Sequence, residues 1–204
     1  MSHQMLTKKN YDFFEVSSAF QKSIRRGLEE DALFWATELM RSNYHKYLWK
    51  RMIIMVSEDI GLANPDLPSQ IMALHAAHLL LKDQKSEWEL PTFHAILLLV
   101  RSSKSRIVDW AKGKSLDQYY LREHDKRIPD YAVDIHTRRG KLEGKTIHDF
   151  FKEGAKLHPH DIIPGESEYL EWCFNCWTDP NWDKTKAVKK QELENQQAGQ
   201  TKMF

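Results

Sequence analysis

The stretch "KRMIIMVSEDIGLANPDL", residues 50–67, best indicates how this chain folds. Its apolar residues recur at helical spacing, which predicts a helix over residues 44–60 with one apolar face. That face comprises Leu48, Met52, Met55, Val56 and Ile60. Gly61 is a natural C-cap, and the Asn-Pro pair at 64–65 predicts a turn. The stretch therefore predicts two consecutive helices joined by a short connection.

The same periodicity continues on both sides of this stretch. It predicts helices over residues 29–41, 69–82, 105–124 and 166–177, with Gly113 as a break in the third of these. The apolar run at 96–100 fits a buried strand or a buried helix; Pro91 at a first helical turn and the lack of partner strands favour a helix. We therefore predict an all-α fold.

Composition divides the chain into four parts. We expect an N-terminal extension at 1–15 and a helical core at 16–126. A loop-rich basic segment and last helix, packed on that core, should occupy 127–182, where glycines and prolines become frequent. Residues 183–204 hold too little apolar material to fold alone and are predicted to be mobile.

Overall charge and hydropathy exclude several classes of protein. The formal net charge is +1, so contact with nucleic acid would have to come from a local basic patch. We expect no membrane span and no secretory signal, because no apolar run approaches the roughly 18 residues that a span needs. With only two cysteines, we expect a cytoplasmic protein.

The segment "HTRRGKLEGKT", residues 136–146, superficially resembles a phosphate-binding loop. Its two glycines enclose three residues, whereas a Walker A loop needs four between its first glycine and the Gly-Lys-Thr. The preceding "IPDYAVDIHT" also does not fit a buried strand. The remaining basic group is either a solvated loop or a contact for phosphate or nucleic acid. It consists of Arg138, Arg139, Lys141 and Lys145.

Four segments of the chain resemble the C-terminal region of the replication-associated recombination ATPases, named MgsA or RarA in bacteria and Werner-interacting ATPase in eukaryotes. They are "SSAFQKSIRRGLEEDALFWATELM", "KRMIIMVSEDIGLANPDL", "ELPTFHAILLLVRSSKS" and "IPDYAVDIHTRRGKLEGKT". The resemblance implies an all-helical domain similar to the clamp-loader collar, through which the family forms tetramers.

This resemblance also implies the chain's partners. They would be further copies of the chain or a recombination ATPase relative, with DNA as a possible ligand. The family's ATPase domain is expected to be absent here, so we expect a non-enzymatic assembly module without a cofactor.

The acidic doublet Glu58-Asp59 falls in the last turn before Gly61, at the negative end of the helix dipole. A cationic partner is therefore predicted, and the candidates are Arg25, Arg26 and Arg106. We favour an ion pair between helices over a catalytic carboxylate pair, because an acidic doublet alone is weak evidence for acid-base chemistry.

An alternative hypothesis is a phosphate- or metal-dependent enzyme. Its site would consist of Asp134, His136, Arg138, Arg139 and His148, because an aspartate and a histidine beside two arginines could bind a nucleotide. Such a site requires the five side chains to converge on one pocket.

Two further groups have structural alternatives. The set His158, His160, Cys173 and Cys176 offers zinc-type donors at nonstandard spacing, so we favour packed free thiols and no metal. A second basic group lies beside Trp110 and Tyr119, a pattern that suits single-stranded nucleic acid. It consists of Arg101, Lys104, Arg106, Lys112 and Lys114. We favour an amphipathic helix whose aromatic residues face the core.

Overall fold

The computed structural model describes residues 5–121 and 125–181, and this part of the chain is built from helices and their connections. One isolated antiparallel bridge, between Leu6 and Asp12, is the nearest approach to a sheet within these residues. The all-α prediction is confirmed. In the described residues no helix has the length and apolar character needed to cross a membrane.

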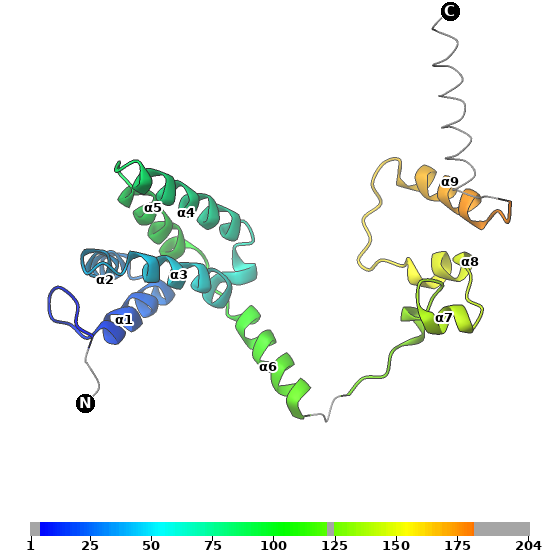
Figure 1. Cartoon of the computed structure of the whole chain (residues 1–204), viewed down its shortest axis with the longest axis horizontal. Helices are drawn as coiled ribbons and strands as arrows, with labels where there is room; N and C mark the ends of the chain where they lie inside the picture. The colour runs from blue at the N-terminus through cyan, green and yellow to red at the C-terminus, as the bar shows by residue number, and fades with distance from the viewer. Residues whose placement is uncertain (1–4, 122–124, 182–204) are drawn as a thin grey trace, which may run out of the picture. The chain divides into compact units, whose positions relative to one another are not determined.

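The chain divides into two compact units at residue 125, and each is described separately. The first unit contains six α-helices among its described residues, drawn from blue to green in Figure 1. Their bounds are α1 Phe13–Arg26, α2 Glu29–Arg41, α3 His45–Met55, α4 Leu67–Asp83, α5 Glu89–Arg101 and α6 Ile107–Leu121. Between α3 and α4 lie a π-helical turn, η1 Val56–Ile60, and a 3₁₀ turn, η2 Gly61–Ala63.

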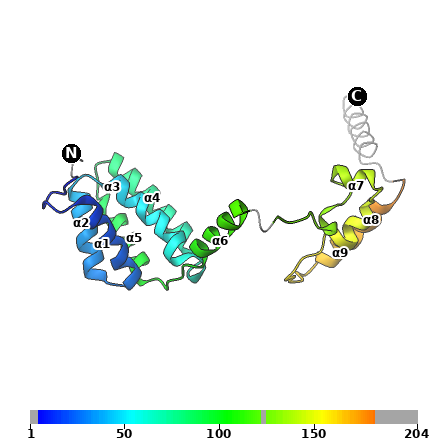
Figure 2. The same cartoon turned by 90° about the horizontal axis from the view of Figure 1, so that it is seen from below.

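Helix α5 is central in the first unit, because it contacts α1, α2, α3 and α4. This position explains the apolar run that fits either a strand or a helix: Ile96 and Leu99 are fully buried in a helix that neighbours surround. The layers of this bundle can be followed from two directions in Figures 1 and 2.

The opening stretch folds as two helices with an unusual junction. Residues 45–55 are α-helical, and the chain then widens into η1 instead of ending at once. Gly61 follows with φ +50° and ψ −122°, a conformation that strongly favours glycine. Helix α4 begins at Leu67, two residues before the predicted start, because Pro68 is accommodated in its first turn.

Two further sequence-based boundaries differ from the structure. Gly113 does not break α6, which runs through it to Leu121. Helix α1 begins at Phe13, inside the predicted N-terminal extension, because Asp12 caps it: Oδ1 of Asp12 accepts hydrogen bonds from the amides of Phe14 at 2.8 Å and Glu15 at 3.1 Å.

The second unit carries shorter elements. They are η3 Asp130–Ala132, α7 Arg138–Leu142, α8 Ile147–Asp149, the π-helical turn η4 Phe150–Gly154 and α9 Glu166–Thr178. An aromatic cluster holds η4 to α9, with the Phe151 ring 5.4 Å from that of Phe174 and 5.6 Å from that of Trp177. The tail predicted to be mobile, 183–204, lies outside the described residues, as does Trp182.

Candidate functional site

The acidic doublet in η1 lies at the centre of an ion-pair network. Nε of Arg25 is 2.7 Å from Oδ1 of Asp59, and Nη2 of Arg25 is 2.9 Å from Oε1 of Glu58. Nη2 of Arg106 lies 3.2 Å from the same Glu58 oxygen. The third candidate, Arg26, does not join the network and instead donates to the Lys22 carbonyl at 3.1 Å. The network thus links α1, η1 and the start of α6.

The same junction seats α6 on the bundle. The amide of Ser105 donates to the carbonyl of Asp59 at 3.0 Å. The missing side chain of Gly61 makes room for Val108, because a Cβ there would lie 2.8 Å from Val108 Cγ2. Asp59 is 1% exposed, so its carboxylate is enclosed in this junction and is not open to solvent.

Beyond this seat, α6 exposes its aromatic residues. Trp110 is 62% exposed and stacks on the Arg106 guanidinium at 4.7 Å, while Tyr119 and Tyr120 are more than three-quarters exposed. The expectation that these aromatic residues face the core is therefore wrong for the described unit. The reason is that α6 packs mainly on η1 and η2 and extends away from the other helices of this unit (Figure 1).

Helix α4 presents an apolar face that the sequence reasoning did not single out. Its inner side is anchored by Leu67, Ile71 and His78, which are buried. On the outside, Met72, Leu79 and Leu80 are each more than half exposed. The available signal was the absence of any Asp, Glu, Lys or Arg between positions 67 and 81. A helix that is apolar all round is normally covered on every side.

In the second unit, the segment resembling a phosphate-binding loop folds as the short helix α7. Oγ1 of Thr137 caps it by accepting the Gly140 amide at 3.0 Å, and the Asp134 carbonyl accepts the Thr137 amide at 3.0 Å. Gly140 is buried so closely against this turn that a Cβ would lie 1.8 Å from the Asp134 oxygen. The first glycine therefore serves packing and not an open cradle for phosphate.

The predicted basic group is divided by this geometry. Arg138, Arg139 and Lys141 are exposed on α7. Arg139 pairs with Glu143 at 3.4 Å, and no described acid lies within ion-pair distance of Arg138 or Lys141. Lys145 is half-buried and turns towards a nearby polar pocket. Three of the four cations thus form an exposed basic surface on one helix.

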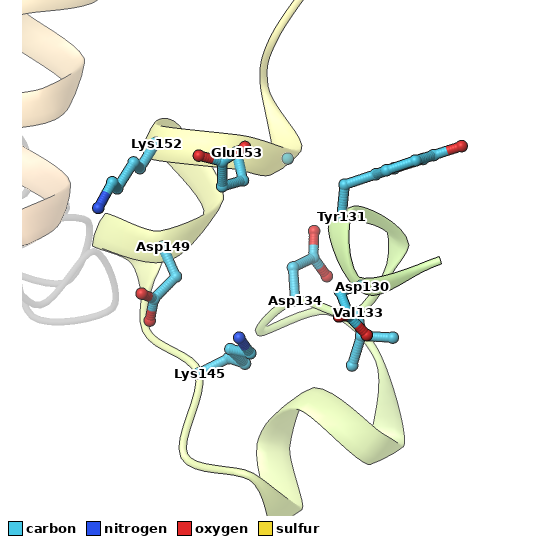
Figure 3. Close-up of a pocket in the computed structure, with 9 residues that line it drawn as sticks. Asp130, Tyr131, Val133, Asp134, Lys145, Asp149, Lys152 and Glu153 are labelled. Carbon is cyan, nitrogen blue, oxygen red and sulfur yellow. The ribbon is translucent and has the colours of Figure 1, made fainter. Parts of the chain in front are cut away.

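The polar pocket lies between η3 and η4 and has a volume of about 290 Å³. Asp134, Asp149 and Lys145 line it, and Lys152 extends away from Asp134 (Figure 3). The pKa of Asp134 is lowered, chiefly by the hydrogen bond from the His136 amide, and that of Asp149 by the Thr146 amide. Backbone donors therefore stabilise the charged form of the Asp134 and Asp149 carboxylates.

Of the five residues in the enzyme hypothesis, only Asp134 lines this pocket. His136 lies beside Asp134, with Nδ1 3.3 Å from Oδ2, while the His148 ring packs 5.4 Å from that of Phe174. The two arginines point to α7's exposed surface. The five side chains do not converge as that hypothesis requires.

The zinc-type set is not brought together either. Nε2 of His160 lies 2.9 Å from Oε1 of Glu166, while Cys173 and Cys176 are half-buried free thiols on α9. Across residues 5–121 and 125–181, no three His, Cys, Asp or Glu side chains are grouped to hold a metal ion.

Comparison of the sequence with known proteins identifies relatives of this chain. The chain is 32% identical over 159 residues to replication-associated recombination protein A of Bacillus subtilis, covering 77% of this chain and 35% of that protein. It is 32% identical over 130 residues to ATPase WRNIP1 of Dictyostelium discoideum, covering 62% of this chain and 14% of that protein. The chain therefore spans about a third or less of these relatives.

A family model described as the MgsA AAA+ ATPase C terminal matches residues 28–164. This range includes α2 to α6 of the first unit and α7, α8 and η4 of the second. The chain belongs to the MgsA AAA+ ATPase C-terminal family.

Proposed function

We propose that this chain is a cytoplasmic, non-enzymatic assembly module of the recombination ATPase family. Its first unit, a collar-like helical domain, joins further copies of the chain or a recombination ATPase relative, with a tetramer as the expected state. The observation that supports this proposal is the outer face of α4, on which Met72, Leu79 and Leu80 are exposed. Relatives named ATPase WRNIP1 and replication-associated recombination protein A support the choice of partner.

The physical argument is the cost of leaving this face in water. Covering the half-exposed leucine and methionine side chains would contribute on the order of 1 kcal/mol each. No charged residue between positions 67 and 81 would have to be desolvated. A neighbouring subunit with a similar apolar face meets these requirements.

Light scattering after size-exclusion chromatography tests self-association. Wild type should form an oligomer, and Leu79→Glu/Leu80→Glu should shift it to the monomer, because two carboxylates would be buried in the interface. Leu157→Glu, at an exposed leucine of the second unit, is the matched control and should leave the mass unchanged. A strictly monomeric wild type at high concentration would contradict homo-oligomerisation.

We further propose that the exposed cations of α7, together with Lys145, contact DNA phosphates. Arg138 and Lys141 carry no described acidic partner, which leaves their charge available to a ligand. Each phosphate that is neutralised adds about 0.7–0.9 to the slope of log affinity against log salt. Replacing Arg138, Arg139, Lys141 and Lys145 by alanine should therefore weaken binding and flatten this slope.

A charge-matched control separates the α7 surface from general attraction. Alanine at Lys22, Arg26, Lys46 and Lys50, which are exposed in the first unit, removes four cations as well. This variant should bind DNA like wild type. Equal loss in both variants would mean that the assignment to α7 is wrong.

A thermal-shift assay tests the non-enzymatic part of the proposal. Nucleotides and divalent metals should not raise the melting temperature of the protein if it has no site that binds them.

A further inference from the structure

A second surface of the first unit is built by α2 together with residues that precede the family match. Residues 5–12 fold back as a hook beside α2 and leave a groove of about 550 Å³. Lys8, Lys9 and Arg41 line it together with the buried acid Glu38 and with Thr37, and Leu33 and Phe34 form its apolar floor. We call this the hook groove.

The hook is held in place by side chains at the end of α2. The Lys9 amide donates to Oε1 of Glu38 at 2.8 Å, and the Lys8 amide donates to Oγ of Ser42 at 2.8 Å. Glu38 is 4% exposed, and Thr7 inside the hook is equally buried. The backbone of both lysines is therefore anchored while their side chains remain exposed.

The floor of the groove combines an exposed ring with a cation. Phe34 is 42% exposed, and Nζ of Lys9 lies 5.1 Å from the centre of its ring. The Trp35 ring meets this ring edge to face, with the two ring centres 4.8 Å apart. A ligand that covers Phe34 must also meet the charge of Lys9, so a purely apolar ligand would leave a cation desolvated without a partner.

The charges of the groove are unequal along α2. The charge of Arg41 is paired with Glu89 at 3.0 Å, and Glu38 is buried beneath the Lys9 amide, so the groove's cations without a described acidic partner are Lys8 and Lys9. Glu30 precedes Phe34 by one helical turn and so lies towards the opposite end of the same face. This polarity favours a ligand whose carboxylates lie beside the lysines and whose apolar side chain lies over the floor.

We propose that the hook groove binds a short acidic peptide segment of a partner protein, with a large apolar side chain on Phe34 and carboxylates at Lys8 and Lys9. This surface is separate from the apolar face of α4 and from the cations of α7. Its occupation therefore does not depend on the proposed assembly or on DNA.

Fluorescence anisotropy with the full chain tests this proposal. The probe is a fluorescein-labelled eight-residue peptide with glutamates flanking a Leu-Leu pair, and its two controls replace glutamate by glutamine or leucine by serine. Saturable binding of the probe is expected, and each control peptide should bind about tenfold more weakly, equivalent to about 1.4 kcal/mol. Equal affinity for the glutamine peptide, or no binding below millimolar concentration, would overturn the proposal.

Variants locate the binding site. Lys8→Glu/Lys9→Glu and Phe34→Ser should each weaken binding about tenfold. Lys22→Glu/Lys50→Glu reverses two exposed lysines elsewhere and should bind like wild type. Unchanged circular dichroism spectra exclude misfolding as the cause. If a single-stranded oligonucleotide, and not the peptide, loses affinity in the hook variants, the groove is a nucleic-acid surface and the peptide proposal is wrong.

Discussion

Nε of Arg25 lies 2.7 Å from Oδ1 of Asp59, a carboxylate that is 1% exposed. Because Arg25 belongs to α1 and Asp59 to η1, this contact ties the first helix to the π-helical turn. The same turn holds the residues just before α6, since the Asp59 carbonyl accepts the Ser105 amide. The geometry of the whole junction therefore depends on a charge that cannot be rehydrated without opening the bundle.

Asp59→Asn should destabilise the first unit by about 2–3 kcal/mol, less than a fully buried pair because Arg25 is about a quarter exposed. The neutral amide keeps the shape but removes the charge that faces two guanidinium groups. Urea unfolding monitored by tryptophan fluorescence measures the change. Glu29→Gln, which breaks the exposed pair with Arg101, should have a smaller effect, and the reverse order would contradict this role.

Gly61→Ala should weaken the packing of α6 against η1 and η2. The added Cβ would meet Val108 Cγ2 at 2.8 Å, and the positive φ adds backbone strain, for a total cost of about 2–4 kcal/mol. Combining it with Val108→Ala removes the clash but not the strain, so recovery should be partial. Full recovery would show that sterics alone require this glycine. Hydrogen exchange of the α6 amides reports the effect locally.

Gly113→Ala should have the opposite sign. Gly113 lies inside α6, and a Cβ there meets nothing within 4 Å. Alanine should therefore stabilise the helix by up to about 1 kcal/mol. A rise in hydrogen-exchange protection along α6 is expected, and a loss of helicity would indicate that the glycine is needed for a contact outside the described structure.

Gly140→Ala should disrupt the turn that carries the α7 cations. The Cβ would lie 1.8 Å from the Asp134 carbonyl oxygen, a distance that demands backbone movement. Loss of the native amide resonances of residues 134–145 in NMR spectra is the expected result. Gly144→Ala, where a Cβ meets no atom within 4 Å but φ is +73°, should perturb the segment less.

His78 should make the first unit sensitive to acid. It is 1% exposed, with Nδ1 3.0 Å from the Trp88 carbonyl, and desolvation lowers its pKa, with Lys82 adding repulsion. The pKa of nearby His45 is also lowered, first by desolvation and then by Lys82. Because the unfolded chain binds these protons more readily, stability should be full above about pH 6.5 and fall below it.

Urea unfolding at pH 7.5 and 5.5 measures this dependence. His78→Asn keeps a donor towards the Trp88 carbonyl but cannot titrate, so it should lose less stability on acidification than wild type. An identical loss in both proteins would assign the acid sensitivity to His45 or to other groups.

Local sequence determined the helices with clear periodicity and defined ends. Residues 44–60 are predicted as one helix, and its apolar stripe is buried in the bundle, because apolar spacing and a terminal glycine act within a few residues. The family was recognisable for the same reason, since "SEDIG" and the surrounding segments are linear patterns. A proline in its first turn moved the start of α4 by two residues, and an aspartate cap placed the start of α1 inside the predicted N-terminal extension.

Tertiary structure decided what depends on residues far apart in the chain. Three arginines were chemically equivalent candidates for the acidic doublet, and only packing brings Arg25 and Arg106, but not Arg26, to it. Likewise, the fold does not bring Asp134 and His148 to one site. Asp134 lines the polar pocket, whereas the ring of His148 packs against that of Phe174. Sequence specifies which side chains can interact, whereas distance and desolvation, set by the fold, decide which ones do.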